Sequence, residues 1–160
     1  MPTKRLETSL ESFLKEATIA YANGAMDEEM IEEGLIAGAY SSGQFTITDT
    51  YRVSDDKRIY SGREEVTHMD APLWSAVYHG AVLPEADPGP VLDLYAHVLR
   101  KPAAELPIRG PRELQIGDYK YTLGSTHGPL KVARFAVIEE ITQHNKRVYR
   151  GDIAGGWISK

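Results

Sequence analysis

Apolar and polar residues alternate along much of the chain, which is the pattern of β-strands with one buried face. The clearest run follows Gly43, where Phe45, Ile47, Tyr51 and Val53 alternate with polar residues. Similar runs, separated by turn-forming residues, predict strands over 43–53, 59–68, 73–82, 117–125, 131–143 and 147–158.

Two segments have the spacing of helices instead. Thr8 and Glu11 form a capping-box pair, and apolar residues on one helical face follow, which predicts a helix over 9–22. The segment 87–90 opens a second helix, predicted over 90–101, and Pro102 ends it. The acidic segment 27–33 suits a short surface helix or an ordered loop.

The second half of the chain resembles the first. Glu64-Glu65-Val66-Thr67 reappears as Glu139-Glu140-Ile141-Thr142, and at the same offset Asp70 aligns with Asn145, Trp74 with Tyr149 and Gly80 with Gly155. Such self-similarity indicates one supersecondary unit used twice. We therefore predict an α+β fold with a duplicated α-βββ unit, in repeats of about 8–82 and 88–158. This fold would be a six-stranded, mainly antiparallel curved sheet with two helices, a pseudo-two-fold axis and a single domain over 1–160.

The amino-acid composition excludes several classes of functional site. The chain has no cysteine, which excludes thiol catalysis and thiolate metal sites and is compatible with a cytoplasmic location. A net charge of −5 with scattered basic residues argues against direct nucleic-acid binding. The sequence shows no signal peptide or membrane span, and the histidine spacing predicts no metal site. No cofactor is expected, and a homodimer is compatible with the sequence.

Carboxylates interrupt the apolar faces of three predicted strands. Glu64 and Glu139 occupy the same repeat position, and Asp49 lies in the preceding strand of the first half. A buried carboxylate must be paired, protonated or open to a cavity, and desolvation raises its pKa toward the range of a working acid or base. Glu65 and Glu140 belong to the opposite face, and we expect them in solvent.

Two interpretations of these acids stay open. They could accept hydrogen bonds from tyrosines, amides or arginines and only fix the strands. Alternatively, they could select a cationic or hydrogen-bond-donating ligand in an aromatic-lined pocket. The expected wall of such a pocket is Tyr60, Trp74, Tyr78, Phe135 and Tyr149.

The pattern Tyr60-x-Gly62-x-Glu64-x-Val66, followed by Pro72-x-Trp74-x-Ala76-x-Tyr78-x-Gly80, resembles a family of bacterial and archaeal domains of unknown function. Arg109-Gly110-Pro111, Gly117-Asp118-Tyr119 and Gly155-Gly156 fit the same family. Members occur alone or joined to helix-turn-helix regulators, which implies a sensing role by association. The predicted α-βββ-α-βββ order is also similar to gyrase-inhibitory-protein-like ligand-binding domains. In those domains an acidic groove residue contacts cationic molecules, and some members are hydrolases, which implies Glu64 and Glu139 as the candidate positions.

Three functions follow from these observations. The first is a sensor-like domain that binds a cationic or aromatic small molecule in a groove between the repeats, through Glu64 or Glu139. The second is a hydrolase in which one of these glutamates is the general base. The third is an acidic protein-interaction module without a ligand. Whether the protein is an enzyme is left open.

Overall fold

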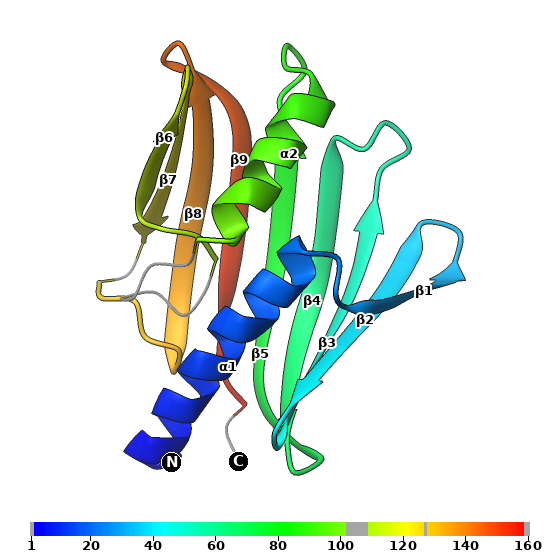
Figure 1. Cartoon of the computed structure of the whole chain (residues 1–160), viewed down its shortest axis with the longest axis vertical. Helices are drawn as coiled ribbons and strands as arrows, with labels where there is room; N and C mark the ends of the chain where they lie inside the picture. Colours follow the sequence, from blue (N-terminus) through cyan, green and yellow to red (C-terminus); the bar gives the residue numbers. More distant parts are fainter. Residues whose placement is uncertain (1, 102–108, 127, 159–160) are drawn as a thin grey trace.

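The computed structural model describes residues 2–101, 109–126 and 128–158. Along the described chain the elements are α1 (Lys4–Ala22), β1 (Asp27–Glu32), β2 (Leu35–Ser42), β3 (Phe45–Val53), β4 (Ile59–His68), β5 (Ala71–Val82), α2 (Pro88–Leu99), β6 (Glu113–Ile116), β7 (Tyr119–Ser125), β8 (Arg134–Gln143) and β9 (Lys146–Trp157). The strands form one sheet in the order β1-β2-β3-β4-β5-β9-β8-β7-β6, with every neighbouring pair antiparallel. Both helices lie across the same face of this sheet (Figure 1).

The predicted α+β class is right, but the predicted six-stranded sheet with duplicated α-βββ units is wrong. The sheet has nine strands, because β1, β2 and β6 were not predicted. Gly43 and Gly117, which the sequence analysis placed at the starts of strands, have φ values of 60° and 56° and make the turns that join β2 to β3 and β6 to β7. The preceding strand was missed in both cases.

The acidic segment 27–33 is neither a helix nor a loop. Its residues Asp27–Glu32 form β1, an edge strand exposed along its whole length, so it lacks the alternation of a half-buried strand. Gly34, at φ 73°, turns the chain into β2. Small residues dominate β2, and only Gly38 is buried there, which explains why its pattern gave no strand signal.

Helix α1 begins earlier than predicted. Thr3 is the N-cap and its side chain accepts a hydrogen bond from the amide of Leu6, whereas the Thr8 hydroxyl donates to the carbonyl of Lys4 inside the helix. Asp87 caps α2 in the same way through Gly89. At the far end of α1, the Arg100 guanidinium donates to the Ala22 carbonyl at 2.7 Å, which ties the ends of the two helices together.

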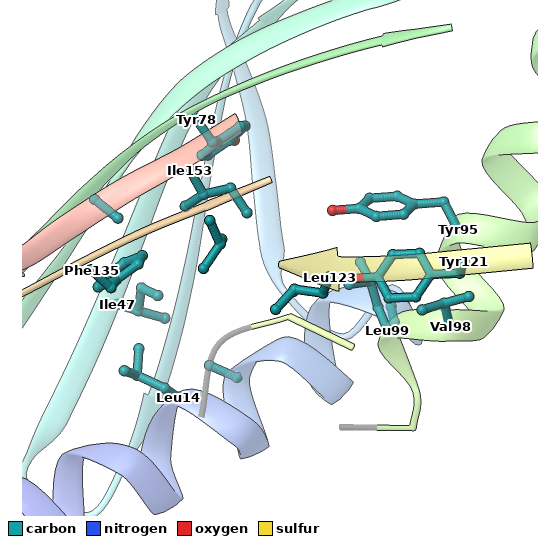
Figure 2. Packing of buried hydrophobic residues seen from close by; sticks show 14 of the residues in the cluster. Leu14, Ile47, Tyr78, Tyr95, Val98, Leu99, Tyr121, Leu123, Phe135 and Ile153 are labelled. Carbon is teal, nitrogen blue, oxygen red and sulfur yellow. The ribbon is translucent and has the colours of Figure 1, made fainter. Parts of the chain in front are cut away.

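The core fills the space between the helices and the covered face of the sheet. Leu10, Phe13, Leu14 and Ala17 from α1 and Val91, Tyr95, Val98 and Leu99 from α2 are buried in it with residues of β3, β4, β5, β7, β8 and β9. Figure 2 shows this layer, with Leu14 below Ile47 and Phe135 and the α2 side chains beside Tyr121. Trp74 and Phe135, which were predicted as pocket-wall residues on the apolar strand faces, are 0% and 5% exposed, so those faces point to the core.

The hairpins β4–β5 and β8–β9 share local geometry. Met69 and Asp70 in one turn, and His144 and Asn145 in the other, have positive φ values. The register of each hairpin shifts beside its turn, after Val66 in the first and after Ile141 in the second. In consequence, Glu64 lies opposite Ala76 and Glu139 lies opposite Gly151 on the covered face of the sheet.

Candidate functional site

A small cavity lies under α1, against the part of the sheet made by β3, β4 and β5. Its volume is about 40 Å³. The lining residues are Leu14, Ala17, Thr18 and Tyr21 from α1, Met26 from the connection between α1 and β1, Ile47, Asp49, Tyr60, Glu64, Trp74 and Tyr78 from the sheet, Tyr95 from α2, and Arg109. Polar and aromatic groups of the sheet therefore form its floor, and α1 forms its roof.

Two carboxylates face each other on the floor of this cavity. Asp49 of β3 and Glu64 of β4 are direct cross-strand partners, and both line the cavity. Asp49 is 5% exposed and accepts a hydrogen bond from the Tyr78 hydroxyl at 2.6 Å. Burial, followed by the charge of Glu64, raises the pKa of Asp49 to about 7. Near neutral pH this group can therefore hold or release a proton.

Arg109 is the cation of the cavity. Its Nη1 lies 3.4 Å from Glu64 Oε1, and its guanidinium lies 5.1 Å from the centroid of the Tyr78 ring. The residue is 9% exposed and has a φ of 67°. The following residue fixes this loop against α2, because a Cβ at Gly110 would lie 2.5 Å from Val98 Cγ1. A side chain at position 110 would push Arg109 away from the carboxylates.

Glu139 is sealed away from the cavity. It is 1% exposed and accepts hydrogen bonds from Tyr95 at 2.8 Å and from Tyr121 at 2.7 Å. Tyr95 and Tyr121 extend from different elements with their hydroxyls turned the same way (Figure 2). Burial raises the pKa of Glu139, although Arg109 and the two tyrosine hydroxyls oppose the shift. None of the described residues that line the cavity comes from β7, β8 or β9.

Glycines make room for the tyrosines on this face. Tyr60 lies opposite Gly80, where a Cβ would approach its ring carbons to 2.3 Å. Gly62 does the same for Tyr78, whose hydroxyl would be 2.6 Å from an added Cβ. The tyrosine rings can therefore lie across the neighbouring strand, where the Tyr78 hydroxyl donates to Asp49 and the Tyr60 hydroxyl is hydrogen-bonded to that of Tyr149.

Of the residues predicted for the site, the structure gathers five around the cavity. They are Asp49, Tyr60, Glu64, Trp74 and Tyr78. Phe135, Glu139 and Tyr149 are buried but do not line it. Phe135 stacks on Trp74 with ring centroids 5.7 Å apart, and the Tyr149 hydroxyl is hydrogen-bonded to that of Tyr60. The cavity is thus lined mainly by α1 and by strands of the first half of the chain, and the second half contributes Tyr95 and Arg109.

Arg109, Tyr95 and Tyr21 also line the cavity and were not among the predicted site residues. Arg109 belongs to the family motif Arg109-Gly110-Pro111, and Tyr95 lies within the predicted helix 90–101. A signal was present in Arg109-Gly110, since a glycine after a basic residue permits close approach of a loop to a packed helix. The sequence does not show which carboxylate Arg109 contacts, because that contact depends on how distant elements pack together.

The fold and the site define an α+β domain in which two helices cover one face of an antiparallel sheet and enclose an acidic, tyrosine-lined cavity. The chain belongs to the family described as a domain of unknown function, DUF5680, which matches residues 49–158. The matched part holds Asp49, Glu64, Arg109 and Glu139, whereas α1, the roof of the cavity, precedes it. No curated protein and no solved structure matches the chain.

Among the described residues, no helix has the length and apolar character needed to cross a membrane.

Proposed function

We propose that the protein binds a small cationic molecule in the cavity under α1. One observation carries the proposal: Asp49 and Glu64 face each other in an enclosed site where Arg109 is the only cation among the described lining residues. Arg109 forms an ion pair with Glu64, so an ionised Asp49 has no opposite charge of its own. A buried carboxylate in that state is costly, and a bound cation would remove the cost.

The size of the cavity limits the ligand. About 10–15 Å³ of such volume accommodates one water molecule, so the 40 Å³ available holds about three. Drug-sized ligands need pockets of roughly 300 Å³ or more. The proposal therefore concerns a cation of a few non-hydrogen atoms, or a short cationic group of a longer molecule that enters beside Tyr21, which is 38% exposed.

The test compares ethylammonium with ethanol, which has nearly the same size and no charge. Calorimetric or NMR titration at pH 8, where Asp49 is ionised, should detect binding of ethylammonium and none of ethanol. Asp49→Asn should abolish the binding. Glu65→Gln, on the solvent face of the same strand as Glu64, is the matched control and should bind like wild type. Equal binding of the two compounds, or unchanged binding by Asp49→Asn, would refute the proposal.

A hydrolase is the second candidate, and the raised pKa of Asp49 favours it, because a carboxyl titrating near 7 can exchange protons with a substrate. The two glutamates named as general bases are less suited. Glu64 is paired with Arg109, and Glu139 is enclosed by tyrosines. Turnover of a small amide or ester that is lost in Asp49→Asn would support an enzyme in place of a binding protein.

The remaining parts of the proposal come from the family resemblance and from the surface. A sensor role, the occurrence in bacteria and archaea with helix-turn-helix fusions, the similarity to gyrase-inhibitory-protein-like domains, a cytoplasmic location and a homodimer all stay predictions. An acidic interaction module would use β1, whose Asp27, Glu28 and Glu29 are exposed at the sheet edge. Such a module would function unchanged in Asp49→Asn, which separates it from ligand binding.

A further inference from the structure

Arg109 has a buried donor that the described protein leaves unsatisfied. Its Nε is buried and has no hydrogen-bond partner among the described residues. Buried donors without a partner are rare in native proteins, and each calls for an explanation. Arg109 lines the acidic cavity, so a ligand bound there would supply the missing acceptor.

The charges around the cavity set a second requirement. Asp49, Glu64 and Arg109 together carry one net negative charge when both carboxylates are ionised. Glu139 does not need a positive charge from the ligand, because it lies outside the cavity and already accepts hydrogen bonds from Tyr95 and Tyr121. A ligand with a single positive charge therefore balances the site, whereas a zwitterion leaves Asp49 uncompensated.

We propose that the ligand is a small monocation that also carries a neutral oxygen acceptor, the chemical class of short amino alcohols and amino amides. Its ammonium group lies between Asp49 and Glu64, and its hydroxyl or carbonyl oxygen accepts a hydrogen bond from the Arg109 guanidinium. The cavity volume of about 40 Å³, the space of about three water molecules, restricts the occupying part to about four bonded non-hydrogen atoms. This inference rests on the proposed binding of a cation and adds the acceptor to it.

The decisive comparison is between 2-aminoethanol and propylamine, each titrated into the wild-type protein by calorimetry at pH 8. Both are monocations with the same number of non-hydrogen atoms, and they differ by a hydroxyl in place of a methyl group. A hydrogen bond from the charged Arg109 should make 2-aminoethanol bind roughly ten- to hundredfold more tightly. Glycine, a zwitterion of similar size, should bind more weakly than 2-aminoethanol.

These titrations distinguish the need for an oxygen acceptor on the ligand from cation binding itself. If propylamine binds as tightly as 2-aminoethanol or more tightly, the site selects charge alone; the acceptor is then refuted and cation binding stands. If neither amine binds, both are refuted. Arg109→Lys keeps the charge beside Glu64 and removes the guanidinium donors, so it should reduce the preference for 2-aminoethanol to less than about threefold while propylamine still binds. A preference that survives this change would overturn the role of Arg109, and the wild-type series decides the matter if the variant fails to fold.

Discussion

Two buried carboxylates on the covered face of the sheet have different surroundings. Glu139 accepts two tyrosine hydrogen bonds and is not among the described residues that line the cavity, whereas Asp49 accepts one and lines it. A carboxylate whose lone pairs are satisfied by neutral donors stabilises the tyrosines around it. At the residue scale, Glu139 is therefore a structural group and Asp49 is the group that can respond to a ligand.

Glu139→Gln tests this distinction. The amide keeps one acceptor oxygen for Tyr95 or Tyr121, but its NH₂ group occupies the place of the second acceptor. The free energy of unfolding should fall by about 1–3 kcal/mol, while cation binding at Asp49 is retained. Urea denaturation beside Glu140→Gln, the neighbouring substitution on the opposite face, provides the measurement. A fully stable Glu139→Gln that no longer binds cations would move the site to Glu139.

Asp49 predicts a pH dependence of stability. Its pKa is raised from 3.8 to about 7, so between these values the folded protein keeps a proton that the unfolded chain releases. Stability from this group is complete below pH 4, falls as the pH rises to about 7 and is constant above it. Asp49→Asn removes the dependence, so the variant should gain up to about 4 kcal/mol relative to wild type between pH 4 and 8. Denaturation curves in which this difference stays constant would contradict the raised pKa.

The residues of the site were predictable only in part. Alternation in the sequence places Asp49 and Glu64 on an apolar face, and the structure brings both to the cavity. The alternation of apolar and polar residues does not predict that Tyr95 of α2 donates to Glu139, or that Arg109 forms an ion pair with Glu64. These contacts join residues far apart in the chain, and their geometry follows from how α1, α2 and the loop before β6 pack on the sheet.

At the element scale, strands with one buried face were identified and strands without one were missed. β3, β4 and β5 were placed within a few residues because their side chains alternate in exposure, between buried and more exposed in β3 and β5 and between half-buried and exposed along much of β4. β1 buries none, and β6 has only four residues, half of them exposed, so neither gives a clear periodic signal. Left-handed glycines at 34, 43 and 117 mark the turns that connect these strands to the sheet.

The strand faces themselves can be tested with Trp74. Its ring is fully buried and stacked on Phe135, and its indole N–H donates to the Val132 carbonyl at 3.0 Å. Trp74→Ala should therefore destabilise the protein by about 3–5 kcal/mol. Val77 lies on the same strand, is 57% exposed, and in the Val77→Ala variant should change stability by less than about 0.5 kcal/mol. Equal effects of the two substitutions in thermal or chemical unfolding would show that the faces of β5 are wrongly assigned.

At the scale of the whole molecule, the sheet is continuous across the middle of the sequence. β5 and β9 pair along their length, from Trp74 opposite Trp157 to Val82 opposite Tyr149. The core cluster includes residues from both sides of this junction and from both helices. The cavity floor and its α1 roof therefore depend on one core, although the roof lies outside the matched residues 49–158.

This arrangement predicts that the chain unfolds as a single domain. Tryptophan fluorescence, which reports on Trp74 in β5 and Trp157 in β9, and far-UV circular dichroism should give coincident urea transitions, because buried residues of both halves of the described sheet belong to one core cluster. Leu14→Ala, which opens a space beneath α1, should lower both midpoints together, with a loss of about 2–5 kcal/mol. Two separate transitions, or a Leu14→Ala effect confined to one probe, would mean that the part of the sheet beyond β5 folds independently of α1.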